Sequence, residues 1–492
     1  MIVRRFFSFS VALLSLALSA HAESFFIESV SWEITGRTQE YYLAKAVGIA
    51  AGKVFGTREA LDAYIADKSQ VLINQRVLES VVIDTTIAKT HSGADSPSPV
   101  SLVIRAQDTM NIVVLPYLKY DSNVGLLLAG RGRDYDFLGT TEALYANLNW
   151  QFDAKWKSSP GLDVSFSAPF PLGGREVLLG TSAGVVLPEG KPLGVNLETS
   201  VGYRLPLGIF TVEVDASQSY FSGQLDTRDQ PYADAWYLAS SAGVSASVPL
   251  WEIPLLGRLD SSLALSLSGN WKPGGLLDER IDNGPALGSS VSVSGGRIDW
   301  VGNFRRGLSG SATASLLFNT EGKRFRKLGA TVSAFDFNDE LGYSGRISGF
   351  VSFGYLINSG EYVRGVMNNR IVSDTALFVN LDLPLSALRF KLSDWLAMPS
   401  LRVLDFEQHW SPFLDFGIGH DRASGRYFNI GDSWCGGGVE VITFPTAMRS
   451  FYFRVSAGWD LRDVYKLRSL GGISPRDGRS TREFFFGMGH FY

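Results

Sequence analysis

The stretch Glu361-Tyr-Val-Arg-Gly-Val366 lies in the last third of this 492-residue chain, between two segments in which apolar and polar residues alternate. Alternation of this kind is typical of β-strands, so the stretch is expected to be a loop between two strands. A positive charge, Arg364, flanked by Val363 and Gly365 is an unusual tip for a simple hairpin. We therefore interpret the rest of the sequence as a hollow structure whose interior this loop enters.

Period-2 segments separated by Gly, Asp, Asn and Pro fill the chain from Met110 onward. For example, Leu263, Leu265 and Leu267 alternate with alanine and serine. A barrel with lipid outside and a wet lumen requires apolar residues on one face of each strand and polar residues on the other. A soluble sandwich also alternates, but rarely with so many long strands in series. The tally after Met110 is roughly 16 to 18 strands, and single-chain barrels of bacteria have even counts.

The composition also favours a barrel over a helical membrane protein. Beyond the N-terminus no stretch stays apolar for ~20 residues, the length that a spanning helix needs, and a closed barrel is the other way to cross a bilayer. Glycine is abundant, with 52 residues, which suits the turns of a barrel. The formal charge of −4 argues against a nucleic-acid binder, which needs a basic face. Cys435 is the single cysteine, so no internal disulfide can form.

The N-terminal residues 1–22 have the pattern of a secretory signal. Arg4 and Arg5 form its charged start, Val11 to Leu18 its apolar core, and Ala20-His-Ala22 its cleavage site. The apolar core is too short for a membrane anchor. The sequence thus predicts an exported protein.

Residues 23–108 have a different pattern, which predicts a small α+β domain with the order β-α-α-β-β. A first strand closes at Thr35-Gly36. A helix is expected from Gln39 to Ala51, with Gly52 at its C-terminal end. Thr57 is the expected N-cap of a second helix, and two further strands follow. In its order of elements and in its glycines this segment resembles a POTRA (polypeptide-transport-associated) domain.

The chain ends with a run of aromatic residues, Phe484-Phe-Phe-Gly-Met-Gly-His-Phe-Tyr492. Phe484, Phe486 and Tyr492 are expected on one face of a last strand, with Gly487 between them. A last strand that ends in an aromatic residue resembles the signal by which outer-membrane barrels are recognised for insertion. An aromatic girdle at the membrane interface would produce the same pattern.

Several motifs of the last third together resemble the bacterial surface antigen superfamily. They are the loop around Arg364, the Asp382-Leu-Pro-Leu385 ending, Phe413-Leu-Asp-Phe-Gly417, the glycine-rich Cys435-Gly-Gly-Gly-Val-Glu440 and the aromatic C-terminus. This superfamily includes outer-membrane protein assembly factors and two-partner secretion transporters. The resemblance implies a mainly β protein: a transmembrane antiparallel barrel of sixteen strands over residues 109–492, preceded by one POTRA domain.

The resemblance also implies roles for individual residues. Val363, Arg364 and Gly365 match the family's loop motif, which is tucked into the lumen. Asp415 matches the aspartate that faces the loop arginine, and Asp382 matches a frequent acidic position. Alternation agrees, because Asp415 must point away from the face of its neighbours. Val366 departs from the family's aromatic residue, and an exposed loop arginine remains the alternative.

The function implied is insertion of proteins into the bacterial outer membrane, or translocation of polypeptides across it, with the N-terminal domain in the periplasm. The partners implied are unfolded client proteins, outer-membrane lipid and accessory lipoproteins. A dedicated secretion pore for one client and a passive outer-membrane channel remain alternatives. No cofactor, metal or enzymatic activity is expected, because none of the histidines forms a His-Glu-x-x-His or His-x-His arrangement.

Overall fold

The computed structural model describes residues 24–88, 97–121, 125–152, 156–190, 192–223, 236–253, 257–277, 285–320, 324–367, 370–422 and 424–488. The chain divides into two compact units, and the boundary in the sequence lies between Thr109 and Met110. The signal expected in residues 1–22 lies outside the described residues.

The first unit is a four-stranded sheet with two helices. Its elements are β1 (Phe25–Thr35), α2 (Glu40–Val47), β2 (Val54–Phe55), α3 (Arg58–Asn74), β3 (Leu78–Ile87) and β4 (Ser98–Asp108). The strand order is β2-β1-β4-β3, with β1 and β4 parallel and β3 and β4 antiparallel. The expected order of elements is present, with the two-residue β2 added between the helices.

The start of helix α3 agrees with the sequence prediction, whereas the end of helix α2 does not. Thr57 caps α3, because its hydroxyl accepts from the main-chain N–H of Ala60 at 3.2 Å. Helix α2, by contrast, ends at Val47, earlier than expected, with Gly48 at φ 61° in the left-handed conformation that glycine adopts most easily. The expectation that Gly52 caps this helix was therefore wrong. Ile27, Leu61 and other apolar residues form the core between helices and sheet.

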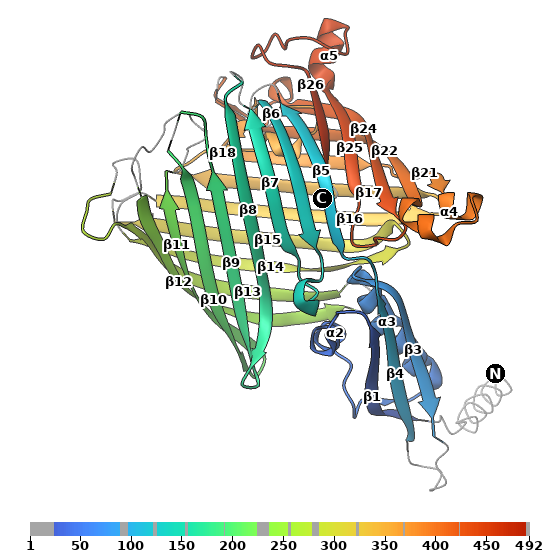
Figure 1. Cartoon of the computed structure of the whole chain (residues 1–492). Helices are drawn as coiled ribbons and strands as arrows, with labels where there is room; N and C mark the ends of the chain where they lie inside the picture. Colours follow the sequence, from blue (N-terminus) through green and yellow to red (C-terminus); the bar gives the residue numbers. More distant parts are fainter. Residues whose placement is uncertain are drawn as a thin grey trace, which may run out of the picture. The chain divides into compact units, whose positions relative to one another are not determined.

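The second unit is a closed antiparallel β-barrel in which the first barrel strand, β5, lies beside the last, β26 (Figure 1). The first nine strands are β5 (Ile112–Asp121), β6 (Gly125–Asp134), β7 (Leu144–Phe152), β8 (Ser158–Leu172), β9 (Arg175–Val186), β10 (Gly194–Leu207), β11 (Phe210–Ser222), β12 (Trp236–Ile253) and β13 (Gly257–Trp271). The remaining long strands are β14 (Ala286–Val301), β15 (Phe304–Asn319), β16 (Arg324–Asn338), β17 (Leu341–Phe353), β20 (Thr375–Asp382), β21 (Leu385–Phe390), β22 (Phe406–Asp421), β24 (Trp434–Pro445), β25 (Phe453–Asp460) and β26 (Arg482–Met488).

The described segments of the barrel form eighteen strands around its circumference. Twenty β segments are in the barrel sheet, but β21 continues β20 along the same neighbour, β22, after a break at Leu383-Pro384. The two-residue β23 (Arg426–Tyr427) only extends a hairpin beyond β22. Eighteen exceeds the sixteen expected from the resemblance and lies within the range of the tally made from alternation.

Alternation along the strands separates a lipid face from a lumen face. On the outward side large apolar side chains are exposed; examples are Leu162, Leu179, Val214, Leu265, Leu328 and Ile347. On the inward side polar groups contact one another, as where Arg204 pairs with Glu176 and Glu213 on neighbouring strands. An apolar outside and a polar inside are the features of a transmembrane barrel.

None of the helices in the described part of the chain is long and apolar enough to cross a membrane.

Three connections at the same end of the barrel position the site. Loop 354–374 joins β17 to β20 and contains the short strands β18 (Ile357–Asn358) and β19 (Val372–Ser373) and the 3-10 turn η2 (Gly360–Tyr362). Loop 422–433 joins β22 to β24. Segment 461–481 joins β25 to β26 and begins with helix α5 (Leu461–Leu467), which Figure 1 shows at the end of the barrel beside β26.

Candidate functional site in the barrel lumen

The loop that carries the predicted motif is packed into the barrel by apolar contacts. Val363 and Val366 are fully buried, in a cluster with Phe350 and Phe378 of the wall. The ring of Tyr362 stacks on Phe378 with 4.9 Å between the centroids. Burial of these side chains favours an inserted loop, because apolar surface leaves water.

Arg364 is held by Asp415 on strand β22. The main-chain N–H and the Nε of Arg364 both donate to Asp415 Oδ2 over 2.8 Å, and Nη2 donates to Oδ1 over 2.7 Å. The Asp415 side chain is completely buried, and that of Arg364 is 6% exposed. A forked guanidinium that meets both oxygens of one carboxylate fixes orientation as well as distance.

Two more carboxylates complete the arginine's surroundings. Nη1 of Arg364 lies 2.6 Å from Asp382 Oδ1 and 3.1 Å from Glu440 Oε1. Glu440 also accepts from Nη1 of Arg454 over 2.8 Å, so two arginines and three carboxylates form one buried cluster, hereafter the lumen cluster. Its members come from the loop and from four neighbouring strands, β20, β22, β24 and β25. Arg364 pairs directly with the carboxylates of the first three strands, and Arg454 joins β25 to them through Glu440. Glu440 ends the glycine-rich motif of the sequence, but no local pattern marks it as a partner of Arg364.

Glycines of the wall make room for the loop's main chain. A Cβ on Gly436 would lie 1.8 Å from the carbonyl oxygen of Arg364, and a Cβ on Gly458 would lie 2.8 Å from the nitrogen of Gly365. Gly365 itself has φ 84°, and a Cβ there would lie 2.4 Å from the nitrogen of Trp459. The glycine-rich run that starts after Cys435 therefore provides a surface on which a backbone, rather than side chains, can rest.

The loop also reaches the last barrel strand, β26. The main-chain N–H of Gly365 donates to Glu483 Oε2 over 2.9 Å. The residues predicted to form the C-terminal signal lie on the same strand but not in the lumen cluster, since Phe484 is 56% and Phe486 37% exposed on the outer face, while Gly487 is buried against Phe485. Tyr492 lies outside the described residues, and the role of these residues in insertion stays a prediction.

The lumen cluster holds the loop through hydrogen bonds and ion pairs between arginines and carboxylates. Its carboxylates accept from arginines, and its only cations are guanidinium groups, which stay protonated in proteins. Within the described residues no group of three or more His, Cys, Asp or Glu is arranged to hold a metal ion. The arrangement is therefore that of an anchoring site between a loop and its barrel.

Comparison with known proteins gives similarity of fold at low sequence identity. No protein-family model matches the chain, and no curated protein matches it. The structure is similar to CdiB from Acinetobacter baumannii, with a TM-score of 0.50 and 13% identity over 94% of this chain and 73% of that one. BamA from Haemophilus ducreyi lacking POTRA domains 1–3 gives a TM-score of 0.42 and 9% identity over 94% and 85% of the two chains. CdiB from Escherichia coli gives 0.43 and 12% over 96% and 91%.

Proposed function

We propose that this chain is an outer-membrane barrel that handles polypeptides: it inserts proteins into the outer membrane of a diderm bacterium or moves a client protein across it. The observation that carries the proposal is loop 354–374, which is anchored in the lumen through Arg364 and bonded to the last strand through Gly365. A passive channel has no need for a loop bonded to the strand at which the barrel closes.

The N-terminal unit would receive the client in the periplasm. Strand order places β3 at an edge of its sheet, where it pairs only with β4 within the described residues. An extended client segment could add to that edge as a further strand, with main-chain hydrogen bonds giving affinity. An even number of barrel strands puts both ends of the barrel on one side of the membrane, in agreement with a periplasmic N-terminal unit.

The barrel would open sideways between β5 and β26. An unpaired strand edge templates the pairing of another strand, and Pro116 in β5 lacks the N–H that a ladder bond needs. Tyr117 and Phe486 contact each other across this seam, with 6.4 Å between ring centroids. A disulfide between cysteines placed on β5 and β26, in a Cys435→Ser background, should block client assembly when oxidised and restore it when reduced. Unchanged assembly in the oxidised form would contradict the seam mechanism.

Two narrower functions are distinguished by the clients. A general assembly factor acts on many barrels, whereas a dedicated secretion pore acts on one exported partner. The single N-terminal domain does not choose between them. A passive channel would show large, steady conductance and would not need residues 23–108.

The test is depletion of the protein followed by mass spectrometry of the outer membrane and the medium. Complementation uses the wild type, Arg364→Met, and Arg306→Met as a matched control, because the Arg306–Asp336 pair is more than half exposed. Loss of many barrels would identify an assembly factor, and loss of one exported protein a dedicated pore. The control should complement fully and Arg364→Met should not. An unchanged proteome with altered uptake of small solutes would overturn the proposal.

A further inference from the structure

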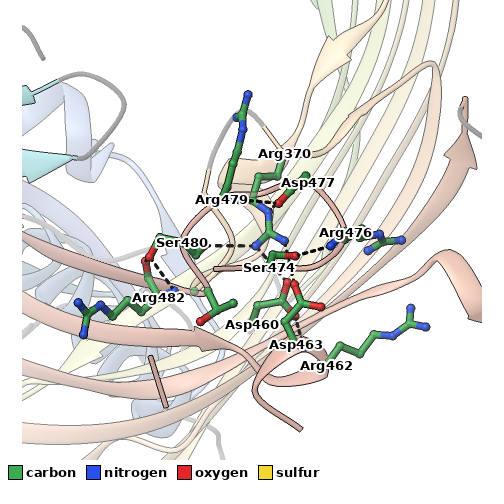
Figure 2. A network of polar contacts seen from close by, with 12 residues as sticks. Arg370, Asp460, Arg462, Asp463, Ser474, Arg476, Asp477, Arg479, Ser480 and Arg482 are labelled. Carbon is green, nitrogen blue, oxygen red and sulfur yellow. Dashed lines mark hydrogen bonds and ion pairs between the residues drawn. The ribbon is translucent and has the colours of Figure 1, made fainter. Parts of the chain in front are cut away.

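The loop has a second arginine, Arg370, whose side chain is completely buried among carboxylates of segment 461–481 and the end of β25 (Figure 2). Its Nη1 lies 3.1 Å from Asp460 Oδ2, its Nη2 lies 3.1 Å from Asp463 Oδ2, and its Nε lies 2.5 Å from Asp477 Oδ2. Figure 2 shows these acidic side chains around the guanidinium of Arg370. Arg370 thus ties loop 354–374 to the connection that leads into β26.

Segment 461–481 is also fastened to loop 422–433, on its other side. Arg462 donates to the carbonyl oxygens of Ser433 and Gly431, each over 2.6 Å. Arg476 donates to the carbonyl oxygen of Asp432 over 2.6 Å. The guanidinium groups of Arg370 and Arg476 both lie over the ring of Trp434, at 5.0 and 3.7 Å from its centroid. The three connections therefore form one bonded group at this end of the barrel.

The path from Arg370 to β26 is short and continuous. Nη1 of Arg370 donates to the carbonyl oxygen of Ser480 over 3.5 Å, a long contact. The main-chain N–H of Asp460 donates to the carbonyl oxygen of Thr481 over 2.9 Å, directly before β26 begins at Arg482. A change in the position of segment 461–481 is therefore passed to the start of β26.

The contact between loop 354–374 and segment 461–481 depends on the charge of one side chain, Arg370. Three carboxylates converge on the guanidinium of Arg370, and without it they would repel one another at close range. Removal of one partner from a buried ionic group leaves uncompensated charge, which is far more disruptive than loss of an exposed pair. Loss of Arg370 should therefore push segment 461–481 away from the loop rather than merely weaken a contact.

We infer that Arg370 is a positioning residue for strand β26: it couples the inserted loop to segment 461–481, so that withdrawal of the loop and release of β26 are one event. The coupling rests on the contacts alone, and only its use in opening the seam rests on the proposed function. Two sites are coupled when each changes the equilibrium of the other through a shared element. Here the shared element is segment 461–481.

Hydrogen exchange of the full-length protein in lipid vesicles, read by mass spectrometry, tests this inference without any client. Arg370→Met should raise the exchange rate of peptides from 461–481 and from β26 about tenfold, within the ~5- to 150-fold range typical of coupled sites. Peptides from β10 and β11 should stay as in the wild type. Arg370→Lys, which keeps the charge but lacks the fork, should give a smaller increase. Arg426→Met is the matched control, because Arg426 pairs with Asp432 at the same end of the barrel but is 55% exposed.

The results separate coupling from mere anchoring. Faster exchange in 461–481 with unchanged exchange in β26 would overturn the inference, and so would unchanged exchange in both. Faster exchange in every strand would indicate a folding defect of Arg370→Met. In that case the variant Asp477→Asn is used for the test, because the side chain of Asp477 is 25% exposed. That variant should accelerate exchange in 461–481 and β26 alone; if β26 stays protected, the inference is wrong.

Discussion

Gly365 donates its main-chain N–H to the carboxylate of Glu483 over 2.9 Å, so the loop in the lumen is bonded directly to the strand that closes the barrel. A side-chain acceptor for a main-chain donor holds the loop by its backbone. The arginine next to it holds the loop by its side chain, through Asp415. Adjacent residues of the loop thus bind two different strands, β26 and β22. On the lumen side, the loop therefore connects the last strand of the barrel to a second strand.

Loss of Arg364 from the lumen cluster should destabilise the barrel strongly. Arg364→Met leaves Asp382 and Asp415 without their arginine, while Glu440 keeps Arg454. Breaking a buried ion pair costs about 3–5 kcal/mol. The measurement is the free energy of unfolding in urea from lipid vesicles. Arg306→Met removes an exposed pair, worth about 0–1 kcal/mol. Equal losses in the two variants would show that the lumen cluster does not stabilise the fold.

A single methyl group on the wall should displace the loop without touching any charge. A Cβ at Gly436 would lie 1.8 Å from the carbonyl oxygen of Arg364, so Gly436→Ala should cost about 1–3 kcal/mol by overpacking. Gly130→Ala on strand β6 is the control, because its Cβ would have no neighbour within 4 Å. Hydrogen exchange of residues 357–367 should rise in the first variant only. A protected loop in Gly436→Ala would contradict the close approach.

The outer face of strand β13 should reject charge that the inner face accepts. Leu265 is 46% exposed in the middle of this strand, and Ser266 points to the opposite side. Leu265→Arg should cost about 2–4 kcal/mol in a bilayer, as an arginine near the midplane does, while Ser266→Arg meets a polar lumen. The measurement is folding into lipid vesicles at graded urea. Equal tolerance of both arginines would contradict a lipid-facing Leu265.

Acid should loosen segment 461–481. Burial alone would raise the pKa of Asp463, but the hydrogen bond from Ser474 and the interaction with Arg370 outweigh it, so the pKa lies below its ordinary value. A carboxyl with a lowered folded pKa contributes stability above its unfolded pKa, about 3.9, and loses that contribution as the pH falls through the folded pKa. The segment should therefore be protected at pH 5 and above, on the order of one unit over the unfolded pKa.

Pepsin, which is active in acid and cleaves beside large apolar residues, measures this loosening at the exposed Tyr465 and Leu470. Cleavage in the wild type should accelerate as the pH falls from about 4 toward 2, the range below the unfolded pKa. In Asp463→Asn the same cleavage should be fast throughout, once corrected for the enzyme's own pH profile. Parallel pH profiles for the two proteins would show that Asp463 does not hold the segment.

Alternation was enough to predict the barrel and the direction of its key side chain. Asp415 had to point away from Leu414 and Phe416, and in the structure it is fully buried while Leu414 is 46% exposed. Such a prediction succeeds because the period of a strand is two, so one lipid-facing neighbour decides the face of the next residue. Strand number is a weaker prediction, because a break such as Leu383-Pro384 cannot be told from a turn by pattern alone.

Contacts between distant connections could not be predicted in this way. Arg370 meets partners 90 to 107 positions later in the chain, and no local pattern marks an arginine as the partner of Asp460, Asp463 or Asp477. Only closure of the barrel brings these connections together. The same holds for Glu483, which alternation places on the lumen face but cannot pair with Gly365.

The lumen cluster has one carboxylate more than it has arginines. Rings of acidic side chains in a pore attract cations and repel anions. Any water-filled path that passes the anchored loop therefore runs beside a net negative charge. Ionic leak past the anchored loop is consequently expected to favour cations such as potassium over chloride.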